Sequence, residues 1–231
     1  MTKLFIDIET FGHKPEEKEI VLPTEADVKV GNLKDPQKIA DKIAETLPIL
    51  QQEAKDKAAS EFEKEWRGNA LKSLSSDIIC ISLAFDDGPV MNIYGGTEQE
   101  LMNELQNVLL DKIGAQFTMT TMVIAHNGKG FDFPFLRHRA IKYKMTHLFR
   151  VFDFDRYSNR AVDTQELWGG TDWRGYYSLA NIAKFLGIQA KTDMSGDKVH
   201  DHFLNGEIDK IANYCGEDVD VLRKVYNALE M

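Results

Sequence analysis

The chain has 231 residues, of which 43% are apolar and 28% are charged, and its formal net charge at pH 7 is −9. This length suits one domain with a sizeable core, while the negative charge argues against a protein that coats nucleic acid by bulk attraction. No apolar run approaches the roughly 20 residues of a membrane-spanning helix, and the N-terminus becomes acidic too early for a secretory signal. Cys80 and Cys215 lie far apart in the sequence. We therefore expect no disulfide and a reducing compartment, the cytoplasm (the host cytoplasm for a viral chain).

The first predicted element is a buried strand over residues 3–8, where apolar side chains alternate tightly. A polar stretch leads from it to a helix whose start is marked by Asp35 and Pro36, an N-cap and a first helical residue. Pro48 is expected to bend or end this helix, and a second charged helical run follows it. Residues 12–75 are therefore predicted to form a helical insertion between the first and second strands.

Beyond the insertion, β-branched apolar runs alternate with helical patterns. A turn at residues 86–89 joins two strands into a hairpin, and Thr97 caps the helix after it. Strands are predicted at 77–85, 90–94, 122–125 and 161–164, and helices at 97–113, 131–142, 179–186 and 208–229. This order predicts an α/β fold with a mixed, mostly five-stranded sheet flanked by helices.

Two carboxylates end the first predicted strand. Asp7 and Glu9 are two residues apart, so their side chains share one face of the strand. Burying two charges without a counter-ion is costly, and a divalent cation with oxygen ligands would remove that cost. The alternative is a pair that caps the end of the strand, and this segment alone leaves both interpretations open.

Two later segments carry further acidic positions. Asp132 lies among phenylalanines, where a carboxylate needs a partner, although capping the following helix is an ordinary alternative. Tyr214 and Asp218 are four residues apart in a predicted helix and share a face, as an exposed pair also would. Gly216 between them weakens the helix and would permit close approach by another segment.

In chain order these segments resemble the DEDD superfamily of 3′→5′ exonucleases, in its tyrosine-bearing (DEDDy) branch. The sister branch has a histidine five residues before the last aspartate, where this chain has Asn213, while Tyr214 fits the tyrosine branch. The similarity is closest to the proofreading exonuclease domains of family B DNA polymerases and their stand-alone relatives. The motifs are D-x-E, N-x-x-x-F-D and Y-x-x-x-D, within residues 4–10, 123–136 and 213–226.

The resemblance implies a ribonuclease H-like domain that trims the 3′ end of single-stranded DNA with two Mg²⁺ or Mn²⁺ ions, which suit carboxylate ligands. Asp7 would bridge both ions, and Glu9 and Asp218 would hold the ion on the nucleophile side. Asp132 would hold the other ion, largely through water, and Tyr214 would orient the attacking water. The alternatives are a 3′→5′ exoribonuclease and a non-catalytic module of the same fold for nucleic-acid binding or replication interactions. No polymerase domain is expected to follow the last motif.

Five further residues are candidates for holding the nucleic-acid strand. Trp173 and Tyr176 belong to a glycine-rich aromatic loop at residues 168–177, and such rings stack on unpaired bases or pack a loop onto the core. The full set of substrate-binding candidates is Thr10, Asn127, Phe131, Trp173 and Tyr176.

Three other features leave functional questions open. Residues 126–150 carry six basic side chains against the single acid Asp132, which is a patch for guiding phosphates or an ordinary solvated helix face. The His-Asp-His run at residues 200–202 is interpreted as a surface loop, since adjacent residues rarely converge on one metal ion. Residues 12–75, within a single domain of residues 1–231, are predicted to form a helical hairpin that acts as a lid, a dimer contact or a docking arm for replication or repair proteins.

Overall fold

The computed structural model describes residues 2–114, 121–155, 158–172, 176–189 and 194–230. The chain forms two compact units. One consists of Met1–Gly12 with Ala70–Met231, and the other is His13–Asn69, which corresponds to the insertion predicted at residues 12–75. Among the described residues, no helix is long and apolar enough to cross a membrane.

The larger unit is built on one five-stranded sheet. Its strands are β1 (Thr2–Gly12), β2 (Ser76–Phe85), β3 (Met91–Tyr94), β4 (Thr121–Ala125) and β5 (Ala161–Asp163). They lie in the order β3-β2-β1-β4-β5, with β2 antiparallel to β1 and β3, and with β4 and β5 parallel to β1 and to each other. The predicted mixed, ribonuclease H-like sheet is therefore confirmed, with β1 at its centre.

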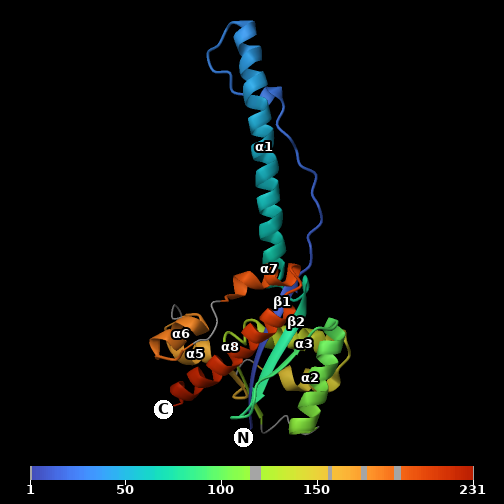
Figure 1. Cartoon of the computed structure of the whole chain (residues 1–231), viewed down its shortest axis with the longest axis vertical. Helices are drawn as coiled ribbons and strands as arrows, with labels where there is room; N and C mark the ends of the chain where they lie inside the picture. The colour runs from blue at the N-terminus through green and yellow to red at the C-terminus, as the bar shows by residue number, and fades with distance from the viewer. Residues whose placement is uncertain (1, 115–120, 156–157, 173–175, 190–193, 231) are drawn as a thin grey trace. The chain divides into compact units, whose positions relative to one another are not determined.

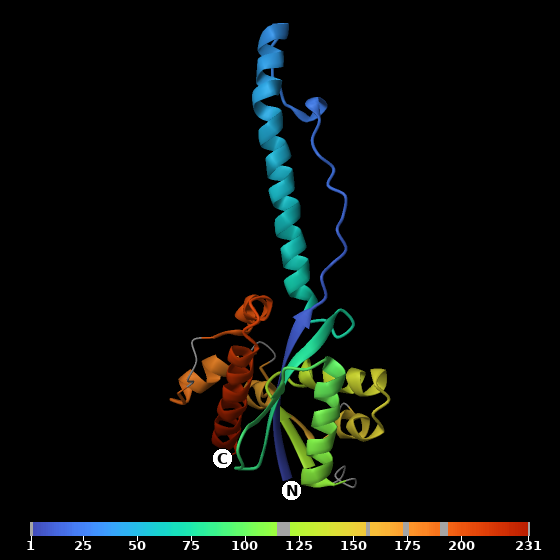
Figure 2. The ribbon, with the colours of Figure 1, turned by 45° about the vertical axis from the view of Figure 1, so that its right-hand side comes forward.

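Helices cover both faces of this sheet (Figures 1 and 2). Leu4, Ile6 and Ile8 of β1 point into the core formed with α2, α3 and α4, whereas Phe5 packs against α8. Alternate residues of β1 thus face opposite layers, and the odd-numbered residues face α8. The helices are α2 (Glu98–Ile113), α3 (Asp132–Lys142), α4 (Thr146–Phe152), α5 (Thr164–Gly169), α6 (Leu179–Phe185), α7 (Val199–Leu204) and α8 (Ile208–Leu229), with a 3-10 turn η3 (Gly196–Lys198) before α7.

The insertion contains one long helix rather than a hairpin. Helix α1 (Pro36–Asn69) has 34 residues and continues through Pro48. The expectation that Pro48 ends the helix is wrong, because good helix formers on both sides of it offset the cost of one proline. The second charged helical run predicted after Pro48 is therefore the later part of α1, and the polar stretch before residue 36 is extended, with a 3-10 turn, η1 (Glu25–Asp27).

Within the insertion, the extended segment runs back along α1 (Figure 2). The Asn69 amide donates to the His13 carbonyl at 2.9 Å, and the Lys18 ammonium lies 2.7 Å from the Glu65 carboxylate. Further along, the Gln51 amide donates to the Pro23 carbonyl at 3.0 Å. These three contacts tie the segment to the helix through polar groups.

Candidate active site

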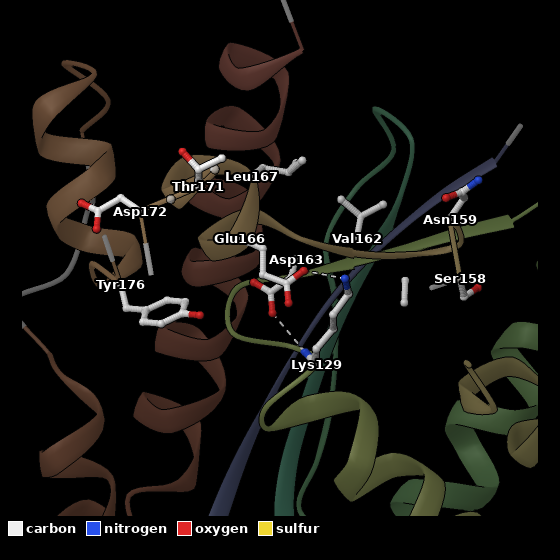
Figure 3. A pocket seen from close by; sticks show the side chains of 13 residues that line it. Lys129, Ser158, Asn159, Val162, Asp163, Glu166, Leu167, Thr171, Asp172 and Tyr176 are labelled. Atoms are coloured by element: carbon white, nitrogen blue, oxygen red, sulfur yellow. Dashed lines mark hydrogen bonds and ion pairs between the residues drawn. The ribbon is translucent and has the colours of Figure 1, made fainter. Parts of the chain in front are cut away.

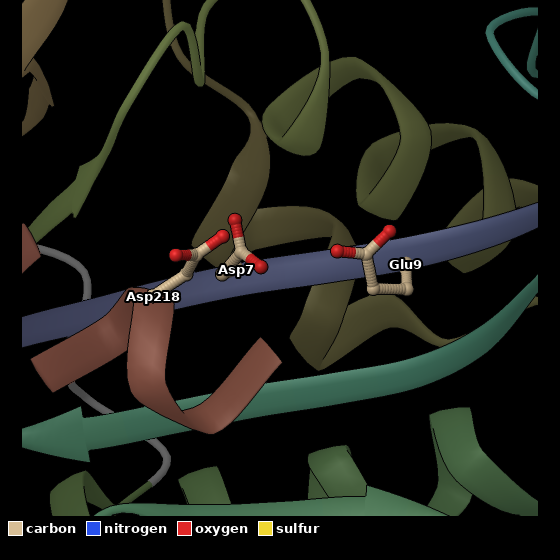
Figure 4. A group of neighbouring side chains, drawn as sticks. All are labelled: Asp7, Glu9 and Asp218. Atoms are coloured by element: carbon tan, nitrogen blue, oxygen red, sulfur yellow. The ribbon is translucent and has the colours of Figure 1, made fainter. Parts of the chain in front are cut away.

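Three carboxylates meet on the α8 side of the central strand. Asp7 and Glu9 belong to the odd-numbered face of β1, and Asp218 reaches the same place from α8 (Figure 4). One oxygen atom from each of the three lies within 4.8 Å of the others. The alternation of β1 therefore brings together two acids that the sequence had left as either a metal site or a strand cap.

Helix α8 comes close enough to the sheet because of its glycine. A Cβ atom at Gly216 would lie 2.6 Å from the side-chain oxygen of Asn92 on β3. The close approach anticipated at Gly216 is thus present. It places Asp218, two residues further along the helix, over β1.

Asp132 lies beside these three carboxylates and is bound to the backbone of β1. It is the first residue of α3, its side chain is only 2% exposed, and its Oδ1 accepts the backbone N–H of Ile8 at 3.1 Å. Phe131 is the N-cap position of α3, and no side chain caps that helix. Asp132 is therefore not a capping residue. It is bonded to the strand between Asp7 and Glu9.

The electrostatic environment of these acids is unfavourable for charge. Among the described residues, no lysine or arginine forms an ion pair with any of the four carboxylates. Burial raises the pKa of Asp132 to about 7 and that of Asp218 to about 6. Burial, followed by the charges of neighbouring acids, also raises the pKa values of Asp7 and Glu9 well above the ordinary range. A cluster of hard oxygen donors without a counter-charge fits one or two divalent cations.

Tyr214 lies one turn before Asp218 on the same helix. Burial and the charge of Asp218 raise the pKa of its phenol well above the usual value near 10. The hydroxyl group therefore keeps its proton at neutral pH and can donate a hydrogen bond, but it does not act as a base.

The segment between β4 and α3 forms a tight loop beside Asp132. Asn127 is exposed and adopts a left-handed φ of 57°, and its carbonyl accepts the N–H groups of Gly130 and Phe131, each at 3.0 Å. The Phe131 ring packs against that of Phe135, with 4.6 Å between centroids. A Cβ atom at Gly128 would lie 2.4 Å from the Cβ of Ala125.

We expect Gly128→Ala to destabilise the protein by about 1–3 kcal/mol, because the added methyl group overlaps a buried side chain at the end of a strand. Affinity for a divalent cation should fall as well, since the same loop leads to Asp132. Urea unfolding and Mn²⁺ titration measure both effects. Gly196→Ala is the matched control, since a Cβ atom there meets nothing within 4 Å. Equal stability of the two variants would contradict the prediction.

The remaining substrate-binding candidates lie in different environments. Thr10 is buried, and its hydroxyl donates to the carbonyl of Ala70 at 2.6 Å. This bond lies within the larger unit and joins β1 to the residue that follows the insertion in the chain. Tyr176 is 60% exposed and lines a cavity of about 700 Å³, which also contains Lys129 and Glu166 (Figure 3). Trp173 lies outside the described residues.

The basic run of residues 126–150 is largely neutralised by internal ion pairs. Arg139 is 3% exposed and pairs with the buried Glu98, which also accepts from Lys142. The other pairs are Lys129 with Glu166 and Arg137 with Asp153. Four of the six basic side chains of this run therefore have acidic partners within the fold, which weakens its interpretation as a free phosphate-guiding patch.

Residues 200–202 are not a surface loop. They lie in α7, where His200 is 6% exposed and stacks on Phe11 with 5.0 Å between ring centroids. His202 pairs with Glu207. The apolar residues on either side of 200–202 belong to the same helix. Residues 200–202 by themselves show no helical pattern.

Two residues near the site were not singled out from the sequence. The Cys215 thiol donates to Oδ2 of Asp7 at 3.2 Å, which helps to fix that carboxylate. Asp163, at the end of β5, accepts backbone N–H groups of the loop that contains Asn127. An acid at the end of a parallel strand next to β4 was the only available signal for Asp163.

A mixed five-stranded sheet with a cluster of carboxylates on its central strand and a flanking helix defines a ribonuclease H-like domain with an acidic, oxygen-donor site. The chain belongs to the family described as predicted 3′-5′ exonuclease related to the exonuclease domain of PolB, whose model matches residues 71–226. The matched part contains Asp132, Tyr214 and Asp218, and it begins after Asp7 and Glu9.

Among solved structures, the family B DNA polymerase from the hyperthermophilic archaeon Pyrobaculum calidifontis is similar to this chain at 15% sequence identity and a TM-score of 0.46. The similarity covers 68% of this chain and 22% of the polymerase chain, so the chain spans about a fifth of that protein. No curated protein sequence matches the chain.

Proposed function

We propose that this protein is a metal-dependent 3′→5′ exonuclease of the tyrosine-bearing type that removes nucleotides from single-stranded DNA. The observation that supports it most is the convergence of Asp7, Glu9 and Asp218 within 4.8 Å, beside the buried Asp132 and without any described cationic partner. A non-catalytic relative would have no need to keep these charges buried together, because each raises the cost of ionising the next.

The chain's own residues suit the chemistry of phosphodiester hydrolysis. Two Mg²⁺ or Mn²⁺ ions would supply a water of lowered pKa and would stabilise the leaving oxygen. Asp7, Glu9 and Asp218 would hold cations on the α8 side of β1. One oxygen of Asp132 accepts the Ile8 N–H, and the other would be open to a cation or its water. The protonated Tyr214 hydroxyl would orient the attacking water by a hydrogen bond.

Replacing Tyr214 by phenylalanine tests this last role. The ring keeps its packing but loses the hydroxyl, so we expect kcat to fall by about 10- to 100-fold. The affinity for Mn²⁺ should stay unchanged, because the phenol is not a metal ligand in this proposal. Steady-state kinetics and Mn²⁺ titration measure the two quantities. Wild-type kcat in the variant would remove Tyr214 from the mechanism.

Polarity, metal dependence and substrate are tested together on single-stranded DNA and RNA labelled at either end. We expect stepwise shortening from the 3′ end with Mg²⁺ or Mn²⁺, no reaction in EDTA, and faster cleavage of DNA, as suits the family's relation to the exonuclease domain of PolB. Faster cleavage of RNA would instead favour the exoribonuclease alternative. Binding without cleavage under all conditions would favour a non-catalytic module.

A further inference from the structure

Asp163 carries a buried carboxylate that the proposed mechanism does not use. It is the last residue of β5 and is only 4% exposed. A carboxylate in such a place needs hydrogen-bond donors to compensate for its lost hydration. The hydrogen-bond donors to Asp163 show which part of the chain this carboxylate holds in place.

Three backbone N–H groups from two separate segments converge on this side chain. Oδ1 accepts from Asn127 at 2.9 Å and from Gln165 at 3.0 Å, and Oδ2 accepts from Lys129 at 3.1 Å. The Gln165 bond makes Asp163 the N-cap of α5. The other two bonds hold the loop after β4, and Figure 3 shows Lys129 of this loop beside Asp163. Ala125, the last residue of β4, pairs with Asp163 in the parallel register.

The residue after Asp163 strengthens the same junction. The hydroxyl of Thr164, which is fully buried, lies 2.9 Å from Nδ1 of His126, and Nε2 of that ring lies 2.9 Å from the carbonyl of Tyr177. A carbonyl only accepts, so Nε2 carries a proton and donates to the Tyr177 carbonyl. The Thr164 hydroxyl also donates to the carbonyl of Ala125 at 3.4 Å. Hydrogen bonds of the His126 side chain and of the Asn127 and Lys129 backbone therefore hold residues 126–129 against the start of α5.

The clamped loop leads directly to the candidate metal ligand on α3. The carbonyl of Asn127 accepts from Phe131, and that of Gly128 accepts from Phe133 at 2.9 Å. Asp132 stands between these two donors, so its position depends on the loop. Displacement of residues 127–129 would move the Asp132 carboxylate relative to Asp7.

We propose that Asp163 is a positioning residue that holds the 127–131 loop, and thereby Asp132, in the arrangement needed to bind a divalent cation. This inference rests on the proposed exonuclease function. It assigns Asp163 no contact with the cation or the substrate.

The test uses Asp163→Ser in the full chain. Serine is a good N-cap and keeps the Gln165 bond, but it is too short to reach both loop amides. We expect the dissociation constant for Mn²⁺, measured by calorimetry, to rise about tenfold, as for other outer-shell partners of metal ligands. Hydrogen exchange should also accelerate at the amides of Asn127 and Lys129.

The matched control is Thr97→Ala, which removes the N-cap of α2 away from the site. It should lose stability but bind Mn²⁺ like the wild type. Asp163→Asn, which retains one acceptor oxygen, should shift Mn²⁺ affinity in the same direction and serves if the serine variant does not fold. Wild-type Mn²⁺ affinity in the Asp163 variants would overturn the inference. Failure of the wild-type protein itself to bind Mn²⁺ or cleave DNA would instead overturn the proposed function.

Discussion

Asp7→Asn is expected to abolish exonuclease activity and to raise the stability of the metal-free protein. Asp7 is the carboxylate that interacts most broadly with the others, because the charges of Asp132, Glu9 and Asp218 all raise its pKa after burial does. Removing it takes away a carboxylate that would hold a cation in the proposed mechanism. We expect a loss of about a thousandfold or more in kcat/KM, equivalent to about 4 kcal/mol of transition-state stabilisation.

The expected gain in stability comes from the interaction of Asp7 with the same neighbouring acids. At pH 8 without metal, the folded protein must either ionise Asp7 beside three neighbouring acids in a buried environment or hold a proton that the unfolded chain has released. A neutral amide of the same shape avoids both costs. We expect Asp7→Asn to increase the free energy of unfolding by about 1–2 kcal/mol in EDTA, as stabilising changes at functional sites commonly do. Urea unfolding in EDTA and a single-stranded DNA assay give the two results.

Asp87→Asn is a suitable control for this pair of measurements. Asp87 lies exposed in the turn between β2 and β3, so its substitution should change neither activity nor stability. An active Asp7→Asn variant would exclude Asp7 from the mechanism. An inactive variant that is also less stable than the wild type would show that Asp7 is held by favourable contacts rather than by a cation.

The fold could be predicted from the sequence largely because the local periodicity of apolar residues indicates the strands and helices. Alternation over the first strand set Asp7 and Glu9 on one face, and the same alternation appears in β1. The spacing of four residues did the same for Tyr214 and Asp218 on α8. In both cases the signal lies within one element, where a side chain's direction follows from its position.

Contacts between residues far apart in the chain leave no such periodic pattern in the sequence. The bond between Asp132 and the Ile8 N–H joins residues 124 positions apart, so the segment around Asp132 by itself favoured capping. The donors to Asp163 are backbone N–H groups, which every residue type except proline provides. Pro48 misled the prediction of the insertion for a different reason. A local rule for proline was applied where the flanking residues of α1 outweighed it.

The metal-free protein is expected to lose stability as the pH rises from about 5 to about 8. Burial raises the pKa of Asp132 to about 7 and that of Asp218 to about 6. Between the ordinary value near 4 and these values, the folded protein holds protons that the unfolded chain has released. Stability is therefore greatest at the acidic end and falls with rising pH until each group has ionised in the folded protein. The combined loss should be on the order of 4 kcal/mol.

Divalent cations should remove this dependence. A bound cation favours the ionised carboxylates and binds only the folded protein, so stability in Mn²⁺ should hold or rise towards pH 8. Urea unfolding at four pH values, in EDTA and in Mn²⁺, measures both curves. Asp218→Asn, which removes one of the titrating groups, should flatten the curve in EDTA. A curve in EDTA that is already flat for the wild type would mean that the acids ionise at ordinary pH in the folded protein, and the argument that they need a cation would fail.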